Sequence, residues 1–312
     1  MSAGRPPKRL VQSVANSMFV DTASDYLVAL ARQNAQVYVA RCAPRAILLA
    51  GSAAEGLADY YSDIDMIVFY DTMLPSDEQL GAVRAEIGAE AYRPLYPRDE
   101  GRSCGEGYRV RGVECQVGHS MVSDVEERIA PVLDGREPAS LQQKAIMGHR
   151  NGIALYGDDL VLTWRVRGAN FSDQLARGMV EHYLCEIFPL WYIAAGLENR
   201  DAGLWVRETL ATAALNVIGV LAGLNKRYYV PFQFKRTRRF LESLTIAPNK
   251  LADRLNDLLL ADQPTAITQM EDIVRETLAL VNQYMPEIDT AAILRREPGE
   301  RQEPWHVQPL DG

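Results

Sequence analysis

The chain has 312 residues, of which 47% are hydrophobic and 24% charged, and a formal net charge of −8. This composition is typical of a folded globular protein, excludes a disordered or fibrous chain, and is long enough for two domains. The acidic balance argues against general nucleic-acid binding, which normally needs a basic surface. No run of eighteen apolar residues occurs and residues 1–10 are not followed by an apolar segment, so we expect no membrane span, no secretory signal and a cytoplasmic location.

The first predicted elements lead to two short strands. Residues 13–42 show a helical apolar pattern, and Pro44 ends it. An apolar strand is expected at residues 47–50 and another at residues 66–70. Between them lie Gly51 and Ser52, a short helix-compatible piece, and the segment Asp63-Ile64-Asp65.

The spacing of Asp63 and Asp65 predicts a pair of carboxylates on one side of a strand, because side chains alternate between the two faces. Two like charges held this close repel each other, and a hard divalent cation such as Mg²⁺ is the natural compensator. Gly51 allows the backbone to approach a phosphate closely, and the start of the following helix offers unpaired N–H groups. We therefore expect metal and phosphate to share this rim of the sheet.

A third carboxylate is predicted on a later strand. In residues 108–118, YRVRGVECQVG, the apolar Val113, Cys115 and Val117 alternate with Glu114 and Gln116. A strand with this pattern buries the apolar set and presents Glu114 on the opposite face.

The remaining elements divide the chain into a mixed first part and a helical second part. We expect helices at residues 78–91, 122–130 and 140–147, a loop or hairpin tip at 97–107, and a short strand at 152–156. From residue 172 onward the pattern is helical, which predicts a bundle. The predicted domains are 1–162, 163–296 and a flexible tail at 297–312.

Gly51-Ser52, ten intervening residues and Asp63-Ile64-Asp65 together resemble the signature of the DNA polymerase β-like nucleotidyltransferase superfamily. The resemblance covers residues 47–116 and implies an α/β (α+β) nucleotidyltransferase domain with a small mixed sheet, followed by an all-α helical bundle domain. It also implies Mg²⁺, ATP or another nucleoside triphosphate as co-substrate, and Asp63, Asp65 and Glu114 as catalytic and metal-binding residues. Glu114 would be either a metal ligand or the base that deprotonates the acceptor hydroxyl.

A basic cluster in the helical part supplies candidates for binding the triphosphate. Six Lys and Arg residues lie within residues 226–239, and we select Lys226 and Lys235, together with Gly51 and Ser52, as nucleotide-binding residues. A solvated basic face is the alternative. We expect the adjacent Tyr228 and Tyr229 to lie in the core or on a cleft wall rather than to stack on a nucleobase.

The two-domain layout is similar to that of aminoglycoside and lincosamide nucleotidyltransferases. The resemblance therefore implies transfer of a nucleoside monophosphate to a hydroxyl of a small acceptor, such as an aminoglycoside-type antibiotic, with release of pyrophosphate. The alternative is a protein-modifying or antitoxin-type nucleotidyltransferase that acts on or binds a partner protein. Arg177 and His182 weakly resemble the ribonuclease motif of HEPN domains.

Overall fold

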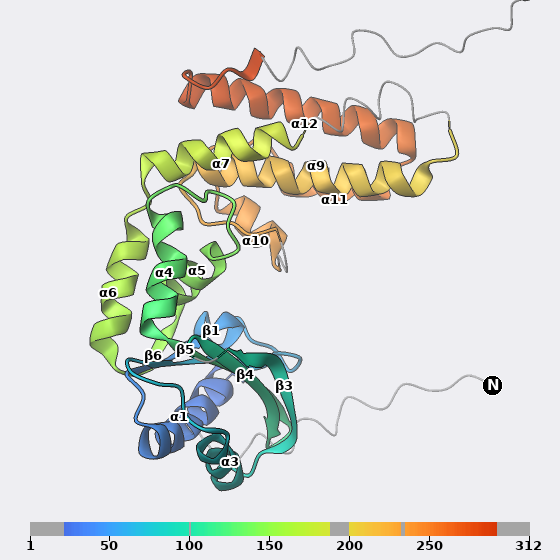
Figure 1. Cartoon of the computed structure of the whole chain (residues 1–312). Coiled ribbons are helices and arrows are strands. Elements are labelled where there is room, and N and C mark those ends of the chain that lie inside the picture. Colours follow the sequence, from blue (N-terminus) through green and yellow to red (C-terminus); the bar gives the residue numbers. More distant parts are fainter. Residues whose placement is uncertain (1–21, 100, 188–199, 232–234, 292–312) are drawn as a thin grey trace, which may run out of the picture. The chain divides into compact units, whose positions relative to one another are not determined.

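The computed structural model describes residues 22–99, 101–187, 200–231 and 235–291 (Figure 1). The chain forms two compact units. The first contains residues up to Ile129 together with Ala145–Asn170, and the second contains Ala130–Lys144 together with the chain from Phe171. The fold is an α/β unit with a mixed sheet and a helical unit, as the sequence predicts.

The first unit is built on a six-stranded sheet with the order β3-β4-β5-β2-β1-β6. Its strands are β1 (Ala46–Ala50), β2 (Ile64–Tyr70), β3 (Glu90–Asp99), β4 (Ser103–Val110), β5 (Val113–Met121) and β6 (Ile153–Tyr156). β2 and β5 are parallel, and the other neighbours are antiparallel. The two strands that carry the predicted carboxylates, β2 and β5, are therefore direct neighbours.

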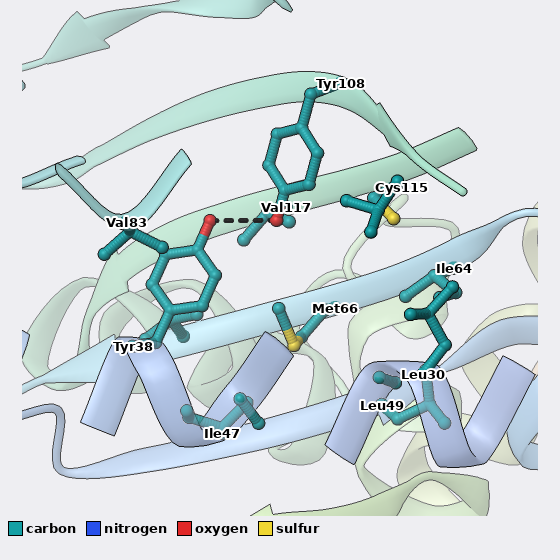
Figure 2. Close-up of a cluster of buried hydrophobic side chains, with 14 of the residues drawn as sticks. Leu30, Tyr38, Ile47, Leu49, Ile64, Met66, Val83, Tyr108, Cys115 and Val117 are labelled. Atoms are coloured by element: carbon teal, nitrogen blue, oxygen red, sulfur yellow. Dashed lines mark hydrogen bonds between the residues drawn. The ribbon is translucent and has the colours of Figure 1, made fainter. Parts of the chain in front are cut away.

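One face of this sheet packs against α1 (Ala23–Cys42) and α3 (Asp77–Glu86) (Figure 1). Ile64 and Met66 of β2 lie with Cys115 and Val117 of β5 in the core cluster of this face (Figure 2). The alternation of these strands sends the intervening residues to the opposite face. The apolar residues of α1 that close the cluster include Leu27, Leu30 and Ala31, as predicted from their helical spacing.

The same core contains a buried polar network. Tyr38 donates a hydrogen bond to Glu106 Oε1 at 2.6 Å, and its hydroxyl lies 3.0 Å from that of Tyr108 (Figure 2). His119 Nε2 lies 3.1 Å from Glu106 Oε1, and Arg84 forms an ion pair with Glu106 Oε2. Glu106 is only 2% exposed, so its charge is compensated entirely by these partners.

The opposite face is covered near β1 and β2 by α4 (Val122–Leu133), α5 (Gln143–Asn151) and α6 (Asp158–Ala169) (Figure 1). The rings of Phe69 and Trp164 are 4.8 Å apart, and His149 stacks on Trp164 at 4.6 Å. The Trp164 Nε1 group donates to Glu126 at 2.5 Å. This aromatic group packs α5 and α6 against β2.

The second unit is helical. Besides residues 130–144 it contains α7 (Asp173–Cys185), α9 (Gly203–Leu224), α10 (Thr237–Glu242), α11 (Leu251–Leu260) and α12 (Gln263–Tyr284). α9 is long and apolar enough to cross a membrane by length and composition, but 56% of its most apolar window is buried inside the structure. It is a core helix of this unit, whose buried residues include Val206, Leu210 and Val217.

The segment between α3 and β5 differs from the prediction. Residues 97–107 contain a hairpin tip, one of the two predicted forms, because β3 and β4 form an antiparallel hairpin that turns at Gly101 and Arg102, but the strands themselves occupy most of this range. Residues 108–118 are not one strand, because a second turn at Arg111 and Gly112, both with positive φ, separates β4 from β5. Pro94 and Pro97 hid the first strand of the hairpin, and they are tolerated because β3 lies at the sheet edge.

Candidate active site

The first contact of the site joins the end of β1 to the start of β2. Gly51 follows β1 directly, begins the short α2 (Gly51–Ala54), and has φ of +67°. A Cβ atom placed on Gly51 would overlap Asp65 Oδ2 and stand 3.2 Å from Asp65 Cγ. The carboxylate of Asp65 is therefore seated directly over the bare Cα of Gly51. Only glycine allows both this backbone conformation and this approach.

Asp63 lies on the same face and contacts β5. Gln116 Nε2 donates a hydrogen bond to Asp63 Oδ2 at 2.9 Å. In the parallel ladder Ile64 is aligned with Cys115 and Asp65 with Gln116. Since Ile64 and Cys115 are buried in the core face, their flanking residues project to the other face. The predicted pairing of Asp63 and Asp65 on one face agrees with this geometry.

Glu114 also projects to this face, where it forms an ion pair with Arg93. Arg93 Nη2 donates to Glu114 Oε1 in a close ion pair, with 49% of the Arg93 side chain and 35% of the Glu114 side chain exposed. Within the described residues, no group of three or more His, Cys, Asp or Glu side chains is close enough to hold a metal ion. The neighbour of Asp63 on β5 is thus the neutral Gln116, and the role of Glu114 stays a prediction.

The loop before Asp63 is held by local hydrogen bonds. Ser62 Oγ accepts from the Asp59 N–H at 3.0 Å and donates to Asp59 Oδ1 at 3.1 Å, and Tyr61 N–H also donates to Asp59 Oδ1, at 2.9 Å. These bonds fix the chain that leads into β2. Ser62 therefore acts as a turn residue. Tyr61 itself is 99% exposed.

Three residues of this face were missed in the sequence. Arg93 rests on β4, where a Cβ at Gly107 would lie 3.1 Å from its Nη1 atom. Tyr96 covers Gly105, and its hydroxyl lies 2.9 Å from the Cβ position of Gly118. Gln116, the third, carried a signal in the sequence, because it alternates in phase with Glu114. Arg93 and Tyr96 carried none, because their strand was not recognised.

The predicted phosphate-binding lysines belong to the helical unit. Lys226 Nζ forms an ion pair with Asp173 at 2.6 Å, and both residues line a cavity of about 570 Å³ together with Arg177, Tyr284 and Glu287. Lys235 is exposed and directly precedes the N-cap of α10. Their proposed role toward a nucleotide remains a prediction.

Two other expectations concern aromatic and basic residues of this unit. Tyr228 and Tyr229 are buried, at 3% and 1% exposure, and the Tyr229 hydroxyl donates to the Leu215 carbonyl at 3.0 Å. They are core residues and do not offer a surface for a base. Arg177 pairs with Glu181 at 2.8 Å along α7, which describes a solvated helix face.

The donor set of Asp63 and Asp65 fits Mg²⁺. Mg²⁺ prefers oxygen ligands and usually binds through one or two carboxylates, with substrate phosphates and water in the remaining positions. The Asp65 carboxylate is held in place by Gly51 and the Asp63 carboxylate by Gln116. Two oriented carboxylates on one face are sufficient for a metal that enters with a phosphate.

Comparison with known proteins adds little. No protein-family model matches the chain, and the search of curated proteins finds no match. Among solved structures, a nucleotidyltransferase-like protein from Exiguobacterium sibiricum 255-15 matches with a TM-score of 0.41 and 11% identity, over 83% of this chain and 81% of that chain. Neither a family nor a function follows from a likeness this weak. The site has to be interpreted from its own residues.

Proposed function

We propose that this protein is a Mg²⁺-dependent nucleotidyltransferase that moves a nucleoside monophosphate, with ATP as the preferred donor, to a hydroxyl of a small acceptor. The observation that carries the proposal is the seating of the Asp65 carboxylate over Gly51, with Asp63 on the same face of the sheet. A glycine turn and two carboxylates are what phosphoryl chemistry requires of a protein: close backbone approach to phosphate and positioned negative charge for a metal.

In this reaction the acceptor oxygen attacks the α-phosphorus, the bond to the bridging oxygen breaks, and pyrophosphate leaves. Bound Mg²⁺ would neutralise the triphosphate and stabilise the charge of the attacking and leaving oxygens. Asp63 and Asp65 would hold the metal, and Gly51 and Ser52 would bind phosphate oxygens. Glu114 takes the proton of the acceptor hydroxyl or completes the metal site. Lys226 and Lys235 of the helical unit keep their predicted role as residues that would contact the β- and γ-phosphates.

The acceptor class follows from charge. The chain carries a net charge of −8, and the candidate site is lined by carboxylates, which favours a cationic hydroxylated molecule such as an aminoglycoside. A partner protein is the second candidate, supported by the exposed Tyr60 and Tyr61 beside Asp63, which are 80% and 99% exposed. Exposed aromatic side chains are enriched in protein interfaces.

The test is a labelling experiment with ATP that carries the label on the α-phosphate. The protein is incubated with Mg²⁺ and a panel of aminoglycosides and lincosamides, and in parallel with a cell extract. A labelled small molecule supports the first candidate, and a labelled protein band supports the second. Absence of label with each of the four nucleoside triphosphates, in both arms, would refute nucleotidyl transfer.

A further inference from the structure

We propose that Arg93 is a phosphate-binding residue that Glu114 holds in place until the metal-bound nucleotide arrives. Arg93 would then pass from the Glu114 carboxylate to a phosphate oxygen, and Glu114 would become available to the metal or to the acceptor. This inference rests on the proposed function and concerns the same site.

The position of Arg93 is built into the sheet. Its guanidinium rests where β4 has a glycine, and a Cβ at Gly107 would stand 3.1 Å from Nη1 and 3.3 Å from Cζ. A larger residue at position 107 would displace it. The guanidinium therefore lies over Gly107, on the face from which Asp63 and Asp65 project, with about half of the side chain exposed.

The position of Glu114, the partner of Arg93, explains why Arg93 can exchange this carboxylate for a phosphate. Glu114 and Gln116 flank Cys115 on β5 as Asp63 and Asp65 flank Ile64 on β2. Glu114 is thus the third carboxylate of this face, and the Arg93 guanidinium compensates its charge. Arg109 is aligned with Glu114 in the β4 and β5 ladder and adds a second positive charge nearby. Compensation by a guanidinium lets the sheet keep three carboxylates in the absence of metal.

A guanidinium suits the exchange. Its planar fork of N–H donors fits carboxylate and phosphate oxygens alike, so one group can serve both partners without moving far. When Mg²⁺ supplies the positive charge that the carboxylates need, the Arg93 charge is no longer required by Glu114, and the phosphates offer it a new partner. The protein then binds bare divalent cation weakly and binds cation and nucleotide together.

The test measures binding without turnover. Mn²⁺, a paramagnetic substitute for Mg²⁺, is titrated into the nucleotide-free protein, and binding is followed by electron paramagnetic resonance. Arg93→Met should raise the affinity for free Mn²⁺ about tenfold, because it removes the positive charge that competes with the cation for Glu114. In the double variant Arg93→Met with Glu114→Gln this gain should disappear. The affinity for Mg²⁺ with a nonhydrolysable ATP analogue, measured by calorimetry, should fall about tenfold in Arg93→Met.

Arg41→Met is the matched control, because Arg41 also forms an ion pair with a glutamate, Glu86, on the surface of the same unit, with 53% and 43% of the side chains exposed. It should change neither affinity. Arg93→Lys, which keeps the charge without the fork, should keep free Mn²⁺ binding weak and still lose nucleotide affinity. Unchanged Mn²⁺ binding in Arg93→Met, or a gain that survives Glu114→Gln, would overturn the inference. Loss of the proposed function is seen separately, as absence of label transfer by the wild-type protein.

Discussion

The carboxylate of Asp65 lies against the Cα of Gly51, so closely that a methyl group on Gly51 would overlap Asp65 Oδ2. This contact joins the end of β1 to the start of β2. It places a charged group beside a glycine turn whose backbone can approach a phosphate closely. It makes position 51 the most sensitive test of the proposed site, because the chain also contains a glycine of similar conformation without such a neighbour.

Gly51→Ala and Gly56→Ala form a matched pair. Their φ angles are +67° and +69°, but nothing lies within 4 Å of a Cβ at Gly56. Both variants should lose about 1 kcal/mol of unfolding free energy from left-handed strain, measured by urea denaturation. Only Gly51→Ala should displace Asp65 and abolish label transfer from ATP. Equal activities of the two variants would count against a role for the Gly51 turn.

Asp63→Asn and Asp65→Asn should each reduce label transfer about 10²- to 10³-fold, because each removes charge that the transition state needs. Both side chains are only half-buried, so far-ultraviolet circular dichroism should show intact folding. Asp71→Asn is the control, since Asp71 follows the other end of β2 and pairs with Arg45 at 3.6 Å. Retained label transfer in both site variants would show that the reaction does not depend on these two carboxylates.

Glu106→Gln should lower the unfolding free energy by about 3 kcal/mol, because breaking a buried ion pair leaves Arg84 without its counter-charge. Glu86→Gln, which breaks the exposed pair with Arg41, should cost less than about 1 kcal/mol. Equal costs in urea denaturation would show that the buried network does not stabilise the sheet.

The charge of Glu106 also gives a pH dependence. Burial acts to raise the pKa of Glu106, but the hydrogen bonds from His119, Tyr38 and Arg84 outweigh it and lower the pKa below 4.5. The stabilisation that the charged Glu106 gives to the folded state is therefore complete above pH 4.5, and it is lost as the pH falls through the lowered pKa. The stability difference between wild type and Glu106→Gln should shrink in that acidic range.

His149 predicts a second pH effect of different origin. Burial lowers the pKa of His149 from 6.5 to about 4, and Arg128 and Arg167 add to this shift while Glu126 opposes it. The unfolded chain then binds the proton more readily than the folded one, so stability falls as the pH drops from 6.5 to 4, by about 3 kcal/mol at most. His149→Phe should have a flatter stability curve over that range in urea denaturation. Parallel curves for wild type and variant would contradict the assignment.

The sequence alone determined the local part of the candidate site. A glycine after an apolar strand, and an Asp-x-Asp before the next one, predicted the Gly51 turn and the common face of Asp63 and Asp65, because strand alternation is a property of the backbone. The helical second unit was also predicted from periodicity, whereas the mixed sheet was expected from the resemblance to a known superfamily. The alternation of residues 113–117 predicted which side of β5 would carry Glu114.

The partners across strands were decided by the tertiary structure. Only the parallel register of β2 and β5 aligns Asp65 with Gln116 and gives Asp63 its amide partner. The pairing of Glu114 with Arg93 depends on a hairpin whose first strand contains two prolines, so its pattern does not read as a strand. Periodicity fixes the face on which a side chain lies, whereas register and sheet order fix what it meets there, and these depend on contacts between segments far apart in the chain.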